Sequence, residues 1–294
     1  MEALLHTASD SCTGCGTCVE VCPNDVLVVA RGKASTDPAR AQRCFHCGGC
    51  VLVCPNGALA LEDVPANDLL PLEQPDFGYP QLLAFLRARR SVRLFKDRPV
   101  EREILEQVLE AASTAPMGFP PHTTEVLVVD QRPELDRLFE AVRKGYEEML
   151  AAYRNPITRQ IVRLSAGAED FHAIQTHVAE IAADANERFR KSGEDRYTYR
   201  APAVMLFHAG RRGISYWTNA VIVATYAMLA AQALGLGATL LDIVAPIINR
   251  SSGLKRRWSI PKDNEIVIAL VLGYPKLRFA RGIRRRLKSV RRAG

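Results

Sequence analysis

All eight cysteines of this 294-residue chain lie within its first 54 positions, and they form two copies of one pattern. The first run is CTGCGTCVEVCP, from Cys12, and the second is CFHCGGCVLVCP, from Cys44. Each cysteine of the second run lies 32 positions after its counterpart in the first. A repeat this close indicates one small unit used twice and related by a pseudo-twofold axis. The fold of this segment is therefore constrained by what two such cysteine runs must bind.

The spacing within each run is typical of iron–sulfur ligands. Three thiolates at CxxCxxC spacing converge on one face of a tight loop, where they can bind three irons of a cubane. The fourth cysteine precedes proline, and in this pattern it binds the other cluster. The sequence therefore predicts two [4Fe–4S] clusters, one held by Cys12, Cys15, Cys18 and Cys54 and the other by Cys44, Cys47, Cys50 and Cys22.

Two other uses of cysteine compete with this interpretation. Structural zinc usually takes cysteines in two separated pairs, whereas each run here has three ligands plus a Cys-Pro. A disulfide framework suits secreted proteins. The N-terminal sequence MEALLHTASDS has no basic start and no apolar stretch of signal-peptide length. We therefore favour iron–sulfur clusters and expect a cytoplasmic protein.

The chain after the cysteines divides into a linker and a larger domain. Residues 64–80 contain four of the 17 prolines and are typical of a linker, so we expect a cluster domain at 1–63 and a second domain at 81–294. Apolar periodicity predicts helices in YPQLLAFLRARR and VEREILEQVLEAAST and strands at 124–130, 202–210 and 265–273. Helices are expected over most of 134–200, with an exposed loop at 191–200. The fold class is α+β.

One uncharged stretch, 214–241, is long enough to raise the question of a membrane span. Asn219 and Gln232 interrupt it, and Gly235 and Gly237 end the helical part before a short strand-like segment. A helix that is apolar on all sides can also form the centre of a large buried interface. We favour a buried helix of about 18 residues over a membrane span.

The net charge of +7 at first suggests a nucleic-acid partner. From Lys276 to Gly294 there are nine basic residues and no acidic one, so the remainder of the chain carries a net charge of −2. No aromatic residue after Phe279 is available to stack on a base. We therefore expect no nucleic-acid partner, and interpret the tail as a solvated segment or as arginines recruited to a phosphate.

Four motifs in order mark the larger domain: RARRSVRLF at 87–95, APMGFPPH at 115–122, ALGLGATLLD at 233–242, and LGYP at 272–275 followed by RRRL at 284–287. The arginine–serine cluster offers bidentate forks and a hydroxyl, which suit a phosphomonoester. Together these motifs resemble the nitroreductase-like flavoproteins over roughly residues 80 to 288. The cysteine segment resembles bacterial two-cluster ferredoxins, so the whole is similar to ferredoxin–nitroreductase fusions of anaerobic bacteria and archaea.

The resemblance implies a homodimer with a mostly antiparallel sheet and FMN bound at the subunit interface, with helix 217–234 in the dimer core. It also implies three groups of flavin contacts. The expected contacts are Arg89, Arg90, Ser91, Arg93, Arg284 and Arg285 for the phosphate, Pro116, Met117, Gly118 and Asn219 around the ring, and Leu240, Leu241 and Asp242 facing its N5. No catalytic side chain stands out; His122, Tyr197 and Tyr199 are conceivable proton donors.

Clusters carry one electron at a time, whereas a flavin can collect two. The sequence therefore predicts an FMN oxidoreductase that receives electrons through its clusters from a low-potential donor such as ferredoxin. The expected acceptors are small molecules with a nitro, quinone or activated C=C group. The alternative is a non-catalytic electron carrier or redox sensor that passes electrons to a protein partner.

Overall fold

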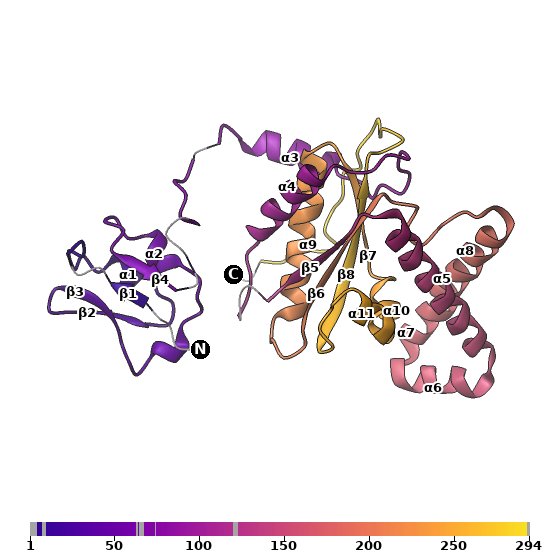
Figure 1. Cartoon of the computed structure of the whole chain (residues 1–294), viewed down its shortest axis with the longest axis horizontal. Coiled ribbons are helices and arrows are strands. Elements are labelled where there is room, and N and C mark those ends of the chain that lie inside the picture. The colour runs from indigo at the N-terminus through magenta and orange to yellow at the C-terminus, as the bar shows by residue number, and fades with distance from the viewer. Residues whose placement is uncertain are drawn as a thin grey trace. The chain divides into compact units, whose positions relative to one another are not determined.

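The structure is a computed structural model, and it describes residues 5–7, 10–62, 64, 68–73, 75–119 and 123–292. The chain forms two compact units, one comprising Met1–Phe77 and Phe119–Pro121 and the other comprising Gly78–Gly118 and His122–Gly294. Figure 1 labels their elements.

The first unit repeats one strand–helix arrangement. Its elements are β1 (Leu5–Thr7), α1 (Thr17–Glu20), β2 (Leu27–Ala30), β3 (Lys33–Thr36), a 3₁₀ turn (Ala41–Arg43), α2 (Gly49–Leu52) and β4 (Leu59–Leu61). β1 pairs antiparallel with β4, and β2 with β3. Both short helices start after a glycine with positive φ, 83° at Gly16 and 72° at Gly48. This left-handed conformation is costly for residues with a Cβ, which explains a glycine at the same point of both runs.

The second unit is built on a four-stranded antiparallel sheet in the order β5-β6-β8-β7. Its strands are β5 (Glu125–Val129), β6 (Ala203–Gly210), β7 (Gly237–Leu241) and β8 (Asn264–Gly273). Its helices are α3 (Tyr79–Ala88), α4 (Arg102–Ser113), α5 (Arg132–Arg154), α6 (Pro156–Ala166), α7 (Ala168–Ala173), a π-helical turn (Ile174–Val178), α8 (Ala179–Ser192), α9 (Tyr216–Ala233), α10 (Ala245–Arg250) and α11 (Ser252–Arg257).

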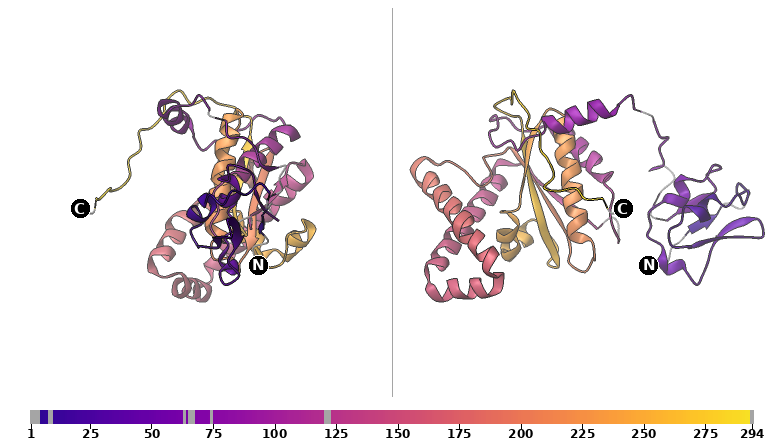
Figure 2. Two further views of the ribbon diagram at one scale, coloured as in Figure 1. Left: turned by 90° about the vertical axis from the view of Figure 1, so that its left-hand side faces the viewer. Right: turned by 180° about the vertical axis from the view of Figure 1, so that it is seen from behind.

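Helices cover both faces of this sheet (Figures 1 and 2). On one face, α4 and α9 bury Val108, Ala224 and Ala227 against Met205 and Phe207 of β6. A second core on the opposite face is formed by α5, α8, α10 and α11 with alternate residues of the same strands, including Leu206 of β6 and Val271 of β8. Because strands β6 and β8 are buried on both faces, they form near-continuous apolar runs instead of alternating with polar residues.

The predicted α+β class and mostly antiparallel sheet are confirmed, and each predicted strand is present to within about two residues. The expectation of an exposed loop at 191–200 is wrong in part, because Asp195, Tyr197 and Thr198 are buried. The Asp195 carboxylate accepts hydrogen bonds from the backbone N–H groups of Tyr197 (2.7 Å) and Thr198 (2.8 Å). This local capping turns the Tyr197 ring inward, where it stacks on Tyr146 at 5.3 Å between ring centroids.

Helix α9 is the uncharged segment that raised the question of a membrane span. It has 18 residues and lies against the sheet, with Asn219, Ala220 and Ala231 fully buried. Within the described residues, no helix combines the length and the apolar character needed to cross a bilayer.

The segment that follows α3 is hydrogen-bonded to the edge strand β7 and to the residues that follow β8. The N–H of Val92 donates to the carbonyl of Ala238 at 3.1 Å, and the N–H of Lys276 donates to the carbonyl of Leu94 at 2.9 Å. At Gly237 the Val92 side chain lies so close that a Cβ on the glycine would be 2.6 Å from it. The sheet edge therefore accepts this segment only because residue 237 has no side chain.

Replacing Gly237 with alanine is expected to lower the free energy of unfolding by about 1–3 kcal/mol, as overpacking in a core does. The double variant Gly237→Ala/Val92→Gly should be less destabilised than the sum of the two single variants, because the Cβ of Val92 would itself lie 2.7 Å from the added Cβ and only removal of the whole side chain relieves the clash. Thermal and urea unfolding measure both effects. Gly253→Ala is the control, since no atom lies within 4 Å of its added Cβ; a loss of stability there equal to that of Gly237→Ala would contradict the steric explanation.

Candidate functional site

In the first unit, the cysteines line two separate cavities. One is lined by Cys12, Cys15, Cys18 and Cys54, together with the loop residues between them. The other is lined by Cys22, Cys44, Cys47 and Cys50. The structure thus brings together the same two sets of four that the spacing predicts, with the Cys-Pro cysteine of each run joining the three cysteines of the other.

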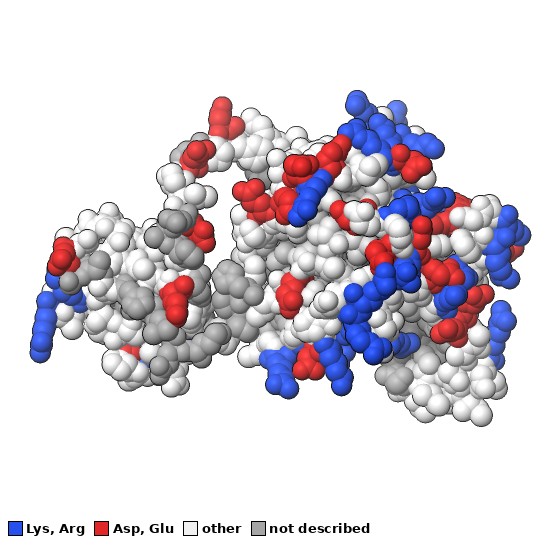
Figure 3. All heavy atoms as spheres, in the orientation of Figure 1, with Lys and Arg blue, Asp and Glu red and all other residues white. Residues whose placement is uncertain are grey.

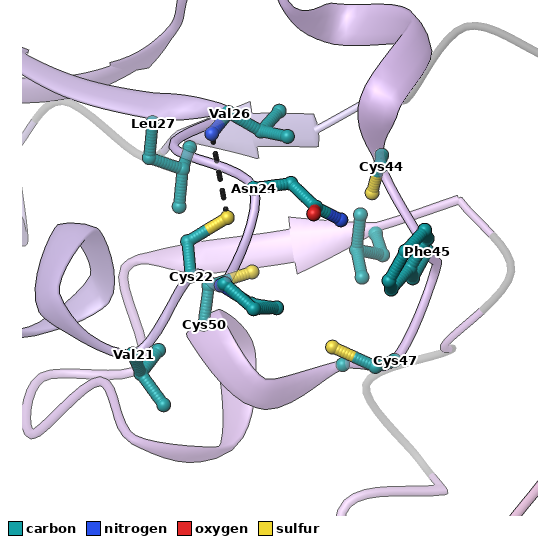
Figure 4. A pocket seen from close by; sticks show the side chains of 12 residues that line it. Val21, Cys22, Asn24, Val26, Leu27, Cys44, Phe45, Cys47 and Cys50 are labelled. Atoms are coloured by element: carbon teal, nitrogen blue, oxygen red, sulfur yellow. Dashed lines mark hydrogen bonds between the residues drawn. The ribbon is translucent and has the colours of Figure 1, made fainter. Parts of the chain in front are cut away.

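Figure 4 shows the second cavity, with the sulfur atoms of its four cysteines turned toward a common space. The N–H of Val26 donates to Cys22 Sγ at 3.4 Å. The equivalent bond in the other repeat runs from Ala58 N–H to Cys54 Sγ at 3.2 Å. Backbone N–H groups aimed at sulfur stabilise thiolates and tune bound clusters. Both cavities therefore have the donor set and the hydrogen bonding that an iron–sulfur cluster needs.

The thiols differ in how readily they ionise. The pKa of Cys12 lies below its ordinary value because the N–H of Ala34 donates to its Sγ, at 3.4 Å. The Thr17 side chain likewise holds the pKa of Cys15 down. Burial instead raises the pKa of Cys50 to about 11. A bound metal centre takes thiolates and so offsets the cost of burying them.

In the second unit, two of the predicted phosphate-binding arginines, Arg89 and Arg90, border a cavity of about 490 Å³. We call it the arginine cavity. It is lined by Ala88, Arg89, Arg90, Val92, Met228, Gln232, Leu236, Gly237, Ala238, Pro275, Leu277, Arg278 and Phe279. Gln232 secures its wall by donating from Nε2 to the carbonyl of Phe85 at 2.6 Å, which fixes the last turn of α3 against α9. Arg89 Nη1 lies 3.7 Å from Sδ of Met228, which is on α9, as is Gln232.

Arg90 carries a buried nitrogen that lacks a partner. Its Nη1 donates to the carbonyl of Arg89 at 2.5 Å, whereas its Nη2 is buried and makes no hydrogen bond within the described residues. The C-terminal tail passes close by, since a Cβ on Gly282 would lie 2.9 Å from that Nη2. A buried cationic donor without an acceptor is costly. An anionic group with several oxygens, such as a phosphate, is what this cavity fits.

The other predicted phosphate contacts do not all line this cavity. Ser91 forms an isolated bridge with Ala238 of β7. Arg284 lines a neighbouring cavity of about 450 Å³, between the tail and α3, whereas Arg285 is exposed and lines neither. The Arg93 guanidinium lies over the ring of Tyr199, 5.7 Å from its centroid. The structure therefore gathers Arg89 and Arg90, with Arg284 next to them, and directs Arg93 elsewhere.

The predicted ring contacts at 116–118 form a loop that α9 holds in place. The N–H of Gly118 donates to Asn219 Oδ1 at 2.7 Å, and Asn219 Nδ2 donates to the Gly118 carbonyl at 3.1 Å. Asn219 is fully buried, Met117 packs on the core, and Pro116 is exposed. Asn219, which is expected at the polar edge of a ring, holds the backbone of this loop through both of its side-chain amide atoms.

The third predicted group lies at the end of β7. Leu240 packs toward the α4–α9 core and Leu241 toward the opposite core, as alternation along a strand requires. Asp242 follows the strand and is exposed. The carbonyl of Ile243, the next residue, accepts a hydrogen bond from Tyr146 at 3.0 Å. The backbone that leaves β7 is thus held by a core side chain.

Of the conceivable proton donors, two can be located. Tyr197 is buried and donates to the carbonyl of Ala182 at 3.2 Å, and burial raises its pKa. Tyr199 lies beneath Arg93. Both are therefore occupied in packing, and His122 lies outside the described residues.

Sequence reasoning missed several residues of the arginine cavity. Met228, Leu236 and the tail residues Leu277 and Phe279 line it, although none belongs to a phosphate-binding pattern. Gln232 stands out in the sequence as a polar residue in an otherwise apolar helix. The sequence does not identify its hydrogen-bond partner, which is 147 residues away. A contact of that range is visible only once the chain is folded.

Comparison with known families agrees with this geometry. The Nitroreductase family model matches residues 86–274, and the 4Fe-4S dicluster domain model matches residues 11–59. No curated protein matches the chain.

Solved structures share the fold of the second unit. The chain is similar to a nitroreductase with bound FMN from Bacteroides fragilis, at 19% identity and a TM-score of 0.50, over 72% of this chain and 95% of that one. It is also similar to a nitroreductase with bound FMN from Desulfitobacterium hafniense, at 20% identity and a TM-score of 0.50, over 71% of this chain and 97% of that one. At these identities the likeness concerns the fold, whereas the family match spans more than half of the chain. The chain therefore belongs to the nitroreductase family, with a 4Fe–4S dicluster domain ahead of its nitroreductase domain.

Proposed function

We propose that this protein is an FMN-dependent oxidoreductase that receives electrons through two [4Fe–4S] clusters and reduces small molecules bearing a nitro, quinone or activated C=C group. The observation that carries the proposal is the presence in one chain of two four-cysteine cavities and of a cavity of about 490 Å³ bordered by Arg90, whose buried Nη2 has no partner within the described residues.

The flavin assignment rests on the arginine cavity and on the similar structures that contain FMN. Arg89 and Arg90 would bind the phosphate, with Arg284 beside them. The loop at 116–118, fixed by Asn219, and the end of β7 at Leu240–Asp242 would contact the ring. FMN would supply the chemistry of collecting single electrons and releasing them in pairs.

The electron donor follows from the first unit. Cubane clusters carry one electron at a time and commonly have low potentials. They would be redundant if NAD(P)H reduced the flavin directly. A low-potential donor such as reduced ferredoxin is therefore the proposed physiological source, and the cytoplasm is the proposed compartment because it keeps such centres reduced.

We further propose that the protein works as a homodimer. Helix α3 has no buried residue, and Tyr79, Leu82 and Leu86 on it are exposed, as are Trp217 and Tyr226 on α9. Exposed large apolar side chains at this density are typical of an interface. Light scattering should give about twice the chain mass of 32.5 kDa; the mass of a single chain over the micromolar range would contradict this.

Arg90→Gln is expected to weaken FMN binding about 10- to 100-fold, because it removes a charge-assisted hydrogen bond of about 1.5–3 kcal/mol. Fluorescence titration of the flavin-free protein with FMN measures the affinity. Arg93→Gln is the matched control, since that guanidinium lies over Tyr199, and it should bind FMN within about twofold of wild type. Equal losses in the two variants would show that Arg90 has no special role.

Cys22→Ser/Cys54→Ser removes one proposed ligand from each cluster. This variant should retain FMN, but it should lose at least about tenfold of its turnover with reduced ferredoxin, because the clusters no longer assemble. Reduction of a quinone or nitroaromatic panel under anaerobic conditions measures turnover. Wild-type protein should turn over slowly with NADPH alone. Rapid turnover of the cysteine variant with ferredoxin would exclude the clusters as the entry point, and failure of wild type on the whole panel would favour an electron carrier.

A further inference from the structure

A second cationic cavity lies in the nitroreductase unit, lined by different residues from the arginine cavity. It has a volume of about 840 Å³ and is lined by Gly210, Arg211, Arg212, Asn249, Arg250, Ser252, Lys255, Arg256, Ile260, Lys262 and Asp263. Six of these residues are cationic and one is acidic. Figure 3 shows lysine and arginine atoms gathered along this edge of the unit, around α11. We call it the basic cavity.

Most of its positive charge is uncompensated. Arg211 pairs with Glu265, at 2.9 Å between Nε and Oε2. In the described part of the chain, Arg212, Arg250, Arg256 and Lys262 form no ion pair. Like charges held around one hollow repel each other, and a bound anion would offset that repulsion.

The wall of the basic cavity is rigid where Lys255 enters it. Lys255 is only 9% exposed, and its Nζ donates to the carbonyl of Asn264 at 2.6 Å. The Asn264 side chain lies 2.9 Å from Nδ1 of buried His208 and donates to Glu125 at 2.6 Å. An ammonium group has three donors, so Lys255 keeps donors for a ligand while its position is fixed from behind.

The dimensions and lining of the cavity favour a small ligand over a macromolecule. A volume of about 840 Å³ lies in the range of small-molecule sites. None of its lining residues is aromatic, so it offers no surface on which a nucleobase would stack. Arginine forks and a buried ammonium together are a set that binds phosphate oxygens.

We propose that the basic cavity, formed by the end of β6, helices α10 and α11 and the loop before β8, binds a small anion carrying two or more phosphate groups. This site is separate from the flavin site, and it does not depend on the proposed function. The ligand would bridge the Arg211–Arg212 turn on one side and the Arg250–Arg256 segment on the other, with Lys255 at the base.

The test is calorimetric titration of the full chain with pyrophosphate in the presence of excess FMN, which under the proposed function occupies the arginine cavity. Wild-type protein should bind one pyrophosphate per chain. The triple variant Arg212→Gln/Arg256→Gln/Lys262→Gln should bind it at least about 100-fold more weakly. Lys255 is left unchanged because it supports Asn264. Thermal unfolding checks that the variant is folded.

The control variant Arg154→Gln/Arg159→Gln/Arg163→Gln removes the same charge from exposed positions on α5 and α6, and it should bind pyrophosphate within about twofold of wild type. Arg90→Gln should likewise leave this affinity unchanged. Equal losses in the two triple variants would show that only net charge matters and would overturn the proposal. So would the absence of saturable binding by wild-type protein, or binding of citrate as tight as that of pyrophosphate.

Discussion

The contact between Val92 and Gly237 is the constraint on which the binding chemistry of the second unit depends. Two adjacent arginines at the end of a helix would ordinarily extend into solvent. Here the backbone bond from Val92 to Ala238 and the missing side chain at 237 fix the segment on the sheet edge. Arg90 is thereby half-buried, and its buried Nη2 has no hydrogen-bond partner among the residues that the structure describes. A buried nitrogen without a hydrogen bond destabilises the folded protein, and a bound ligand that accepts its hydrogen bond would offset this loss. Functional sites commonly contain such locally unfavourable groups.

The first unit depends on a different kind of constraint. Its apolar core is small, and Cys18 is itself one of the few buried members, with Leu27, Val51, Leu59 and Leu61. A core of this size gives little stability by itself. In such small domains, the free energy of binding a metal centre contributes directly to the free energy of folding. The crosswise ligand sets would tie the two repeats together, because each cavity takes its fourth cysteine from the other run.

Local patterns predicted most of the fold and part of the site. Cysteine spacing predicts the same two sets of four that line the two cavities, because three members of each set lie within one short run and the fourth follows from the known exchange of the Cys-Pro cysteine between repeats. Apolar runs predicted the strands, and an uncharged stretch ended by Gly235 and Gly237 predicted helix α9, because both signals are local in sequence. Residues whose roles depend on distant partners were missed or assigned differently. Asn219 clamps a loop 101 residues away, and Gln232 fixes α3 across 147 residues. The Asp195 carboxylate accepts hydrogen bonds from the backbone N–H groups two and three residues after it, and this turns a polar, loop-like segment inward.

Under the proposed function, one chain holds both the clusters and the flavin. Iron, acid-labile sulfide and FMN measured in one sample purified without oxygen test it most directly. The account predicts about eight irons, about eight sulfides and about one FMN per chain. About four irons, zinc in place of iron, or a chain that does not retain FMN even when the flavin is supplied in excess would contradict it.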